Sequence, residues 1–342
     1  MTSIIQNRLV DEREILIVGL GSVGRRHLNN LQTLAWNRIR IFRTGRSTLP
    51  DVDHNAYPVE HDLTTALERR PLAVIVANPS ALHLPVALAA ARAGAHLLIE
   101  KPISHDLEGV SALEGVVSSR GLTALVGFQF RFNPGLQQIK RWIDDGAIGR
   151  VVSAQVHYGE YLPGMHPWED YHLGYAARSE LGGGVLLTFC HAFDYLRWLI
   201  ADVDYVSAFE PRRRPLDVHV DTCVDVTLGF TSGASAHVHL DFVQQPHTHR
   251  LTIVGTGGTI TWSHEDHAAR LYCGVSRQWH TVPAPDGFER NWMFLDEMRH
   301  FLACLRGEEQ PRVTIHDGVE TVKVVMKAKS AIVETAPCAE AT

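Results

Sequence analysis

Short apolar runs alternate with stretches of helical spacing through the first third of the chain. Alternating apolar strands and helices are typical of a parallel sheet with both faces covered. The pattern therefore predicts an α/β domain over residues 12–133. Within it, strands are expected at residues 15–18, 39–42, 72–77, 96–99 and 123–127, and helices at 24–34, 80–92 and 106–119.

The pattern changes after Pro134, where β-rich segments joined by short turns become more frequent. Such segments indicate a second domain of the α+β type, over residues 134–312, with a largely antiparallel open sheet. A helix at 313–335 is expected to pack back on the first domain. The expected elements are helices at 136–144, after Gly184, at 291–306 and at 319–333, and strands at 151–158, 217–230, 234–242, 250–254 and 259–262.

Composition narrows the classes of function. The chain has 342 residues, 45% of them hydrophobic, and a net charge of -6, which does not favour a nucleic-acid partner. No stretch reaches the roughly 18 apolar residues of a membrane span, and we expect no membrane partner. The cysteines form no CxxC pair, and the first residues lack the apolar core of a signal peptide, so we expect the cytoplasm.

A glycine motif, Gly19-x-Gly21-x-x-Gly24, follows the first strand and opens a helix. Gly19 permits the tight turn, Gly21 admits a pyrophosphate, and Gly24 lets the helix pack close to the strand. The motif at this place predicts a Rossmann domain that binds a dinucleotide. Its expected cofactor contacts are Gly19, Gly21, Ser22 and Val23.

The end of the second strand bears on the choice of dinucleotide. An acidic residue there would hold the ribose hydroxyls of NAD, but residues 41–47 contain no carboxylate. Arg43 and Arg46 could pair with the 2′-phosphate of NADP, with Thr44 and Ser47 beside them. We therefore expect NADP, with NAD possible. The alternative is that both arginines are solvated loop residues.

Polar residues also follow the next three strands. Because ligands of an open α/β sheet bind at the carboxyl ends of its strands, we expect Lys101 to reach the cofactor crevice and bond a substrate oxygen. His83 either lines the same crevice or is an ordinary helix residue. The further cofactor contacts expected here are Asn78, Pro79, His83, Glu100, Lys101 and Arg131.

Five stretches carry a resemblance to a known family: GLGSVG, ANPSALH, GAHLLIEKP, GFQFRFNP and GGGVLLTFCHAFDYLRWL. In this order, over roughly residues 13 to 335, they resemble the Gfo/Idh/MocA family, typified by glucose-fructose oxidoreductase, inositol dehydrogenase and rhizopine catabolism proteins. The stretch GEYLPGMHPWEDYHLGYAARSELGGG is further similar to members found with bacterial surface-sugar and nucleotide-sugar pathways.

The resemblance implies two catalytic residues. Lys101 would lie beside the nicotinamide, and His191 would act as general acid and base, with Asp194 on the same helix face. Many relatives have an aspartate three or four positions before this histidine, where this chain has Leu187 and Thr188. A threonine cannot accept the proton at neutral pH. Either Lys101 and His191 suffice, or Tyr158 or Tyr161 donates the proton, or the protein is no catalyst.

Aromatic residues before the second glycine cluster suggest a sugar site. Tyr161 and Trp168 could stack on a sugar ring, and the alternative is a buried aromatic loop. The substrate contacts expected from motif and resemblance are Tyr161, Trp168, Thr188, His191 and Asp194.

Four histidines raise the question of a metal ion. His237 and His239 alternate along a predicted strand, and His247 and His249 follow. No carboxylate or cysteine completes a recognisable site with them, so we expect no metal.

Together these features predict an NAD(P)-dependent oxidoreductase that moves a hydride between nicotinamide and a ring carbon of a sugar, cyclitol or nucleotide-linked sugar. A sheet face without helices would suit a homodimer or homotetramer. Two alternatives stay open. One is a hidden-redox sugar hydrolase or lyase, and the other is a cofactor-binding sensor resembling the galactose-pathway repressor.

Overall fold

The computed structural model describes residues 13–45, 57–211 and 215–332. The chain divides into two compact units. The first extends to Phe132 and takes in residues 180–182 and 288–322 as well. The second comprises residues 133–179, residues 183–287 and the part from Lys323 onwards.

The first unit is built on a six-stranded parallel sheet with strand order β3-β2-β1-β4-β5-β6. The order runs outward in both directions from β1, which pairs with β2 on one side and β4 on the other. This arrangement confirms the predicted Rossmann-type α/β domain. The strands are β1 (Ile15–Val18), β2 (Ile39–Phe42), β3 (Val59–Glu60), β4 (Ala73–Val76), β5 (His96–Glu100) and β6 (Ala124–Gly127).

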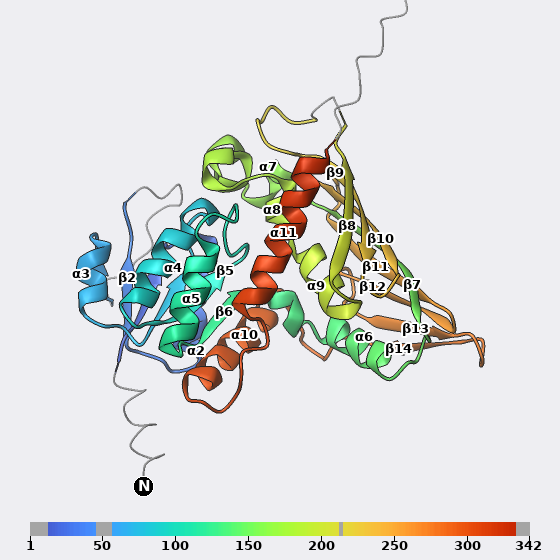
Figure 1. Ribbon diagram of the computed structural model, residues 1–342, viewed down its shortest axis with the longest axis horizontal. Coiled ribbons are helices and arrows are strands. Elements are labelled where there is room, and N and C mark those ends of the chain that lie inside the picture. Colours follow the sequence, from blue (N-terminus) through green and yellow to red (C-terminus); the bar gives the residue numbers. More distant parts are fainter. Residues whose placement is uncertain (1–12, 46–56, 212–214, 333–342) are drawn as a thin grey trace, which may run out of the picture. The chain divides into compact units, whose positions relative to one another are not determined.

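Helices cover this sheet on both faces (Figure 1). All four residues of β1 are buried, as expected for a strand without a solvated face. Helices α4 (His83–Arg92) and α5 (Val110–Arg120) pack against each other, and α4 contacts β4 and β5. On the other face, α2 (Ser22–Thr33) and α10 (Arg290–Leu305) share the core with Ile15 and Ile17.

Helix α10 thus belongs to the first unit, although we expected its residues in the second domain. Met298 and Phe301 are fully buried in the same core cluster as β1. The apolar face of α10 needs a buried surface, and the first sheet provides it.

Helix α5 begins at Val110, so the start predicted at Asp106 was wrong. Gly109 has a φ of +76° and precedes the helix without a side-chain cap. Ser104 and Asp106 accept bonds from the amides two residues further on, at 3.4 and 3.0 Å. These short-range bonds form turns that delay the helix.

The second unit contains an eight-stranded sheet in the order β14-β13-β12-β11-β7-β10-β9-β8. Among the described strands of this sheet, β7 and β10 pair in parallel and the other neighbours are antiparallel, which confirms the largely antiparallel sheet. The strands are β7 (Val151–Gly159), β8 (Val203–Phe209), β9 (Cys223–Phe230), β10 (Ser235–Asp241), β11 (Thr248–Gly255), β12 (Gly258–Ser263), β13 (Ala269–Cys273) and β14 (Gln278–Val282).

In this unit, helices α6 (Pro134–Asp144), α8 (Val185–Thr188) and α9 (His191–Leu199) lie on one face of the sheet (Figure 1). Within the described residues no helix of this unit lies on the other face, where polar side chains alternate with buried ones. The single long helix predicted after Gly184 was wrong, because the chain leaves helical geometry between α8 and α9.

The remaining described helices of the two units are α3 (Leu63–Glu68), α7 (Leu162–Met165) and α11 (Ile315–Ala331). Short 3-10 turns occur at Ser80–Leu82, Gln129–Phe132, Tyr171–Leu173, Tyr175–Ala177 and Ser179–Leu181.

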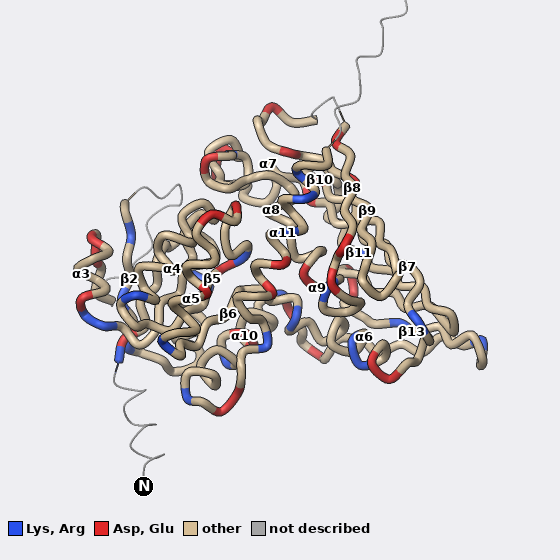
Figure 2. The backbone as a smooth tube through the Cα atoms, in the orientation of Figure 1, with Lys and Arg blue, Asp and Glu red and all other residues tan. Residues whose placement is uncertain are grey.

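Charged residues of both signs are interspersed along both units (Figure 2). In the part of the chain that the structure describes, no helix is long and apolar enough to cross a membrane.

Candidate active site

The turn after β1 has the shape that close approach of a dinucleotide requires. Gly19 has a φ of +94°, and a Cβ atom there would lie 2.8 Å from the carbonyl oxygen of Ala77. A Cβ atom on Gly24 would lie 2.0 Å from the Gly19 oxygen, so α2 packs this closely only with glycine. At Gly21 an added Cβ atom would meet nothing within 4 Å. This side of the turn is therefore open, at the helix end whose free amides attract phosphate.

The end of β2 carries Arg43, which is half-buried, and Thr44, which is exposed. A neighbouring carboxylate, Glu60 of β3, is already occupied, because it bonds Arg40 at 2.9 Å and Arg69 at 3.0 Å. Its charge is therefore neutralised within the protein. Arg46 and Ser47, the other two residues predicted here, lie outside the described residues.

His83 joins the loops that follow β4 and β5. The ring is 2% exposed, with Nδ1 at 2.7 Å from the Pro102 carbonyl oxygen and Nε2 at 2.7 Å from the Asn78 carbonyl oxygen. Burial, the largest influence, lowers the pKa of His83, although both carbonyl contacts oppose it. The residue is therefore a link between two strand ends, in addition to being the first residue of α4.

Glu100 is buried at the end of β5 and holds the residue that follows it. Its Oε1 lies 2.7 Å from His27 Nε2, and its Oε2 accepts the amide of Lys101 at 3.3 Å. Burial alone would raise the pKa of Glu100, but the His27 bond and the charge of Lys101 keep it below the usual value. Glu100 is therefore ionised, and it anchors the backbone of half-buried Lys101.

Arg131 contacts a carboxylate of its own unit. It is 8% exposed, and its Nη2 lies 3.0 Å from Asp317 Oδ1. Asp317 Oδ2 in turn accepts the amide and hydroxyl of Thr314. The pair connects the 3-10 turn after β6 with the beginning of α11. Arg131 thus has a structural contact with Asp317, in addition to the cofactor contact that the sequence predicted.

The second predicted catalytic residue, His191, is the first residue of α9 and 3% exposed. Asp194 follows three residues later on the same helix and is fully buried. Thr188 is 7% exposed and ends the separate helix α8. Lys101 belongs to the first unit, and His191, Asp194 and Thr188 belong to the second.

An aromatic stack lies at the break between α8 and α9. Phe189 lies parallel to Tyr158 of β7, with ring centroids 4.0 Å apart, and His249 covers the opposite face of Tyr158 at 3.9 Å. The Tyr195 hydroxyl lies 3.0 Å from His249 Nε2. Phe189 and Tyr158 are 3% and 6% exposed. Both are therefore core residues.

Asp221, which sequence reasoning missed, holds the start of α8. Its carboxylate accepts the amide of Leu186 at 2.8 Å, and its carbonyl accepts the amide of Val185. A Cβ atom on Gly184 would lie 2.4 Å from the carboxylate. Glycine is thus required where the chain enters α8. Asp221 accepts the Leu186 amide from 35 residues further along the chain, and no local sequence pattern indicates this contact.

The loop before the glycine cluster is partly solvated. Trp168 is 58% exposed, with its ring 5.1 Å from that of His166. Tyr161 is half-buried and precedes α7. The alternative of a buried aromatic loop is therefore wrong for Trp168.

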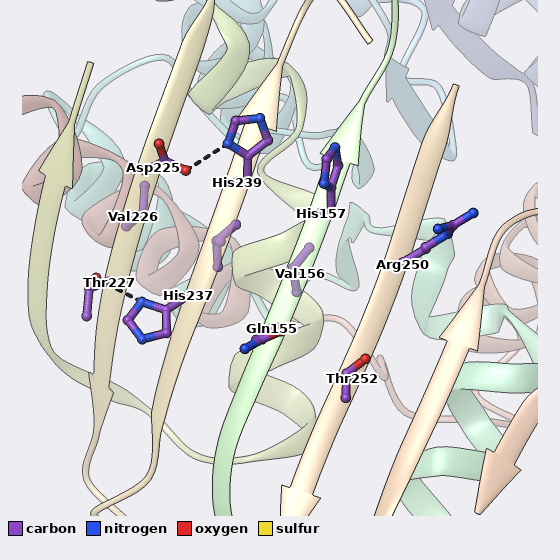
Figure 3. A pocket seen from close by; sticks show the side chains of 11 residues that line it. Gln155, Val156, His157, Asp225, Val226, Thr227, His237, His239, Arg250 and Thr252 are labelled. Atoms are coloured by element: carbon purple, nitrogen blue, oxygen red, sulfur yellow. Dashed lines mark hydrogen bonds and ion pairs between the residues drawn. The ribbon is translucent and has the colours of Figure 1, made fainter. Parts of the chain in front are cut away.

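The uncovered face of the second sheet gathers several histidines, and Asp225 lies beside one of them (Figure 3). His157 and His239 lie opposite each other on β7 and β10, and Asp225 on β9 bonds His239. Asp241 projects beside them. The expectation that no carboxylate accompanies the strand histidines was wrong, because strand pairing brings one from β9. His247 and His249 lie elsewhere, next to Tyr158.

Curated relatives include levoglucosan dehydrogenase of Pseudarthrobacter phenanthrenivorans, 28% identical over 56% of this chain and 55% of the relative. The NAD(+)-dependent scyllo-inositol 2-dehydrogenase of Bacillus subtilis is 27% identical over 75% of this chain and 74% of the relative. The chain thus spans little more than half the length of the first relative. A solved levoglucosan dehydrogenase in complex with NADH shares the fold, with a TM-score of 0.81, 21% identity and coverage of 93% of this chain and 96% of that chain.

Two family descriptions match consecutive parts of the sequence. The oxidoreductase family with an NAD-binding Rossmann fold matches residues 13–128, and the GFO/IDH/MocA C-terminal domain matches residues 136–261. The first contains the glycine turn and Lys101, and the second contains His191. With the Rossmann sheet, the open antiparallel sheet and both matches in agreement, the chain belongs to the Gfo/Idh/MocA family of oxidoreductases.

Proposed function

We propose that the protein is an NAD(P)-dependent dehydrogenase or ketoreductase acting on a CH–OH group at a ring carbon of a sugar, cyclitol or nucleotide-linked sugar. The observation that carries this proposal is the open glycine turn at the start of α2, in a chain of an oxidoreductase family. The relatives named for levoglucosan and scyllo-inositol support a cyclic polyol as substrate class.

The residues of the first unit fit a dinucleotide. Gly21 leaves room for a pyrophosphate at the N-terminus of α2, with Ser22 and Val23 in its first turn, while Gly19 and Gly24 permit the tight turn and the close packing of the helix. Asn78, Pro79 and His83 stand at the end of β4, and Glu100 and Lys101 at the end of β5. A bound nicotinamide would supply or accept the hydride.

Lys101 and His191 are the proposed catalytic residues. The Lys101 ammonium would donate a hydrogen bond to the substrate oxygen and stabilise the negative charge that develops there. The imidazole of His191 would exchange the hydroxyl proton, with Asp194 buried on the same helix. Thr188 can donate or accept a hydrogen bond to the substrate but cannot carry the proton.

The exposed ring of Trp168, together with Tyr161, is proposed to stack on the apolar face of the sugar ring. Because the Trp168 indole is exposed and is not part of the hydrophobic core, its face is accessible for such contact.

For the cofactor, the proposal favours NADP. Arg43 and Thr44 occupy the position where a ribose-binding carboxylate would stand, and Glu60 is bound to Arg40 and Arg69. An arginine can pair with the 2′-phosphate through two hydrogen bonds. Arg46 and Ser47 follow in the sequence and would add to the same contact.

The test of the reaction is a panel of cyclic sugars, cyclitols and nucleotide-linked sugars, assayed with NADPH or NADP by absorbance. Lys101→Met and His191→Asn are expected to lower kcat by about 100-fold or more. Lys327→Met and His280→Asn change exposed residues of the same types and are expected to keep full activity. Normal turnover by both catalytic variants, or cofactor binding without turnover of any substrate, would contradict the proposal.

The cofactor preference is tested by the ratio of kcat/KM for NADPH and NADH. Arg43→Ala and Arg46→Ala are each expected to lower that ratio by about tenfold, while Arg38→Ala at the start of the same strand leaves it unchanged. An unchanged ratio in both variants would favour NAD.

The proposed assembly is a homodimer or homotetramer formed through the uncovered face of the eight-stranded sheet. The proposed compartment is the cytoplasm, because these cysteines of the described residues form no disulfide: Cys190, Cys223, Cys273 and Cys304. Light scattering of the purified chain measures the assembly.

A further inference from the structure

Three side chains converge on the uncovered face of the second sheet. The parallel register pairs His157 of β7 with His239 of β10, and their rings stand on neighbouring strands (Figure 3). Asp241 lies two residues further along β10, on the same face. Its Oδ2 is 3.3 Å from His239 Nε2 and 3.9 Å from His157 Nε2. One ligand atom from each residue lies within 4.8 Å of the other two.

The carboxylate of Asp241 is buried and held in one orientation. The residue is 2% exposed, and its Oδ1 accepts the amides of Val243 and Gln244 at 2.7 and 2.6 Å. A Cβ atom on Gly159 would lie 2.2 Å from Oδ2, so the glycine makes room for the carboxylate over β7. Within the described part of the chain, Oδ2 has no hydrogen-bond partner of acceptable geometry. The remaining oxygen is thus directed at the two imidazoles.

His239 has a second carboxylate on its other nitrogen. Its Nδ1 lies 2.7 Å from Asp225 Oδ1, a bond drawn in Figure 3. When Nδ1 donates its hydrogen to Asp225, the lone pair of Nε2 faces Asp241 and His157. Histidines that bind metal ions commonly donate the other ring N–H to a carboxylate, which sets the tautomer and the ring orientation. His157 Nε2 is also buried, without a hydrogen-bond partner among the described residues.

We propose that His157, His239 and Asp241 bind one divalent transition-metal ion of the zinc class. Zinc bound to nitrogen and oxygen at about 2.0–2.2 Å in a tetrahedron places its ligand atoms about 3.4 Å apart. The observed 3.3 and 3.9 Å from Asp241 Oδ2 to the two imidazole nitrogens are close to that spacing, and all three ligand atoms lie within 4.8 Å of one another. Two imidazoles favour zinc, cobalt or nickel over magnesium or calcium. Three protein ligands leave a fourth position for water.

Charge around the three ligands also suits a cation. Asp225 and Asp241 bring two carboxylates to the cluster. The nearby cation, Arg250 of β11, lies opposite His157 but is paired with Glu265 at 2.7 Å. The competing account is a plain ion pair, in which the two carboxylates keep a proton on His239 and no metal binds. The two accounts differ in their response to added zinc.

The test is a titration of chelator-treated full-length protein with Zn²⁺ by calorimetry, and with Co²⁺ by its visible absorption. The expected result is one Zn²⁺ per chain, and His157→Ala or His239→Ala weakens binding by about 100-fold or more. His237→Ala is the matched control, because His237 lies on the same face of β10 but bonds Thr227. Mg²⁺ is expected not to compete.

Two further variants test the arrangement without removing a ligand. Asp225→Asn removes the negative charge of the carboxylate that bonds His239 Nδ1, and it is expected to weaken zinc binding by about 10- to 100-fold. Gly159→Ala pushes Asp241 Oδ2 aside and is expected to weaken it as well. Each variant is first checked for native circular dichroism. Sugar turnover does not enter this test, so it is independent of the proposed function.

Several results would overturn the proposal. One is no binding of Zn²⁺ or Co²⁺ to the wild-type protein. Another is undiminished binding in a His157→Ala, His239→Ala double variant, which would place the ion elsewhere, for example at His247 and His264. Equal binding of Mg²⁺ would also exclude a site of the zinc class.

Discussion

Glu100 Oε1 lies 2.7 Å from His27 Nε2 in the interior of the first unit, and Glu297 is buried near the same carboxylate. Burial and the charge of Glu100 raise the pKa of Glu297 well above its usual value. The His27 bond, by contrast, keeps Glu100 ionised. Of the two carboxyl groups, Glu297 therefore keeps its proton to higher pH, and Glu100 loses its proton more readily, next to Lys101.

Glu297→Gln is predicted to make the protein more stable at neutral and higher pH. Because the pKa of Glu297 is raised on folding, the protonated side chain contributes to the free energy of unfolding. That contribution is complete below about pH 4.5 and is lost as the pH rises toward the folded-state pKa. The loss is up to about 1.4 kcal/mol for each pH unit in that interval. Urea unfolding from pH 5 to 8 should show a gap between variant and wild type that widens with pH.

Glu108→Gln, an exposed substitution of the same kind, should follow the wild-type curve. Parallel curves for Glu297→Gln and wild type would show that Glu297 is ionised in the folded protein.

Alanine substitutions of two glycines in the turn after β1 are predicted to have different effects, one on stability and one on cofactor binding. Gly24→Ala places a methyl group 2.0 Å from the Gly19 oxygen and should lower the free energy of unfolding by about 1–3 kcal/mol. Gly21→Ala meets no protein atom, so the cofactor-free protein should keep its stability. Its affinity for NADPH should instead fall by about tenfold or more. Thermal unfolding with and without NADPH measures both effects. A destabilised Gly21→Ala protein would refute this distinction.

The buried side chain of His249 is predicted to make the free energy of unfolding fall as the pH is lowered. Burial, with the nearby His264 and His247, lowers the pKa of His249 well below its usual value. Its contribution to stability is therefore complete above about pH 6.5 and is lost as the pH falls below it, by up to about 1.4 kcal/mol for each unit. His249→Gln should flatten the fall in unfolding free energy between pH 7 and 5. His237→Gln, at an exposed position, should leave it unchanged, and equal slopes for the two variants would contradict the assignment.

Tyr158 is predicted to be dispensable as a proton donor. It is stacked between Phe189 and His249, so Tyr158→Phe should preserve the stack and keep kcat within about twofold. Tyr158→Ala should remove about 3–5 kcal/mol of stability, as for other large core residues. A loss of about 100-fold in kcat for Tyr158→Phe, with unchanged stability, would instead identify the hydroxyl as the acid.

Much of the first unit was predictable because its signals are local. A buried strand, a glycine turn and a helix depend on residues close together, and β1, the turn and α2 occur where the pattern predicted them. The error at α5 came from short-range bonds of Ser104 and Asp106, residue types that favour helix starts and turns alike.

The second unit was less predictable. Strands β8, β13 and β14 were not predicted, although the antiparallel character was. At the break before His191, Phe189 stacks on Tyr158, a residue 31 positions earlier whose partner no local pattern indicates. Asp221 and Gly184 meet for the same reason, through a contact between distant segments.

By itself the sequence determined the two kinds of domain, the dinucleotide turn and Lys101 as a candidate, because periodicity, glycine spacing and strand ends are properties of neighbouring residues. The choice of His191 as a candidate came from the resemblance of its motif to the family. Only the tertiary structure decided which charges meet. Strand pairing placed Asp225 on His239, and helix packing buried Glu297 near Glu100. Register and packing depend on how whole apolar faces fit together, so the partners of these groups appear only when the chain is folded.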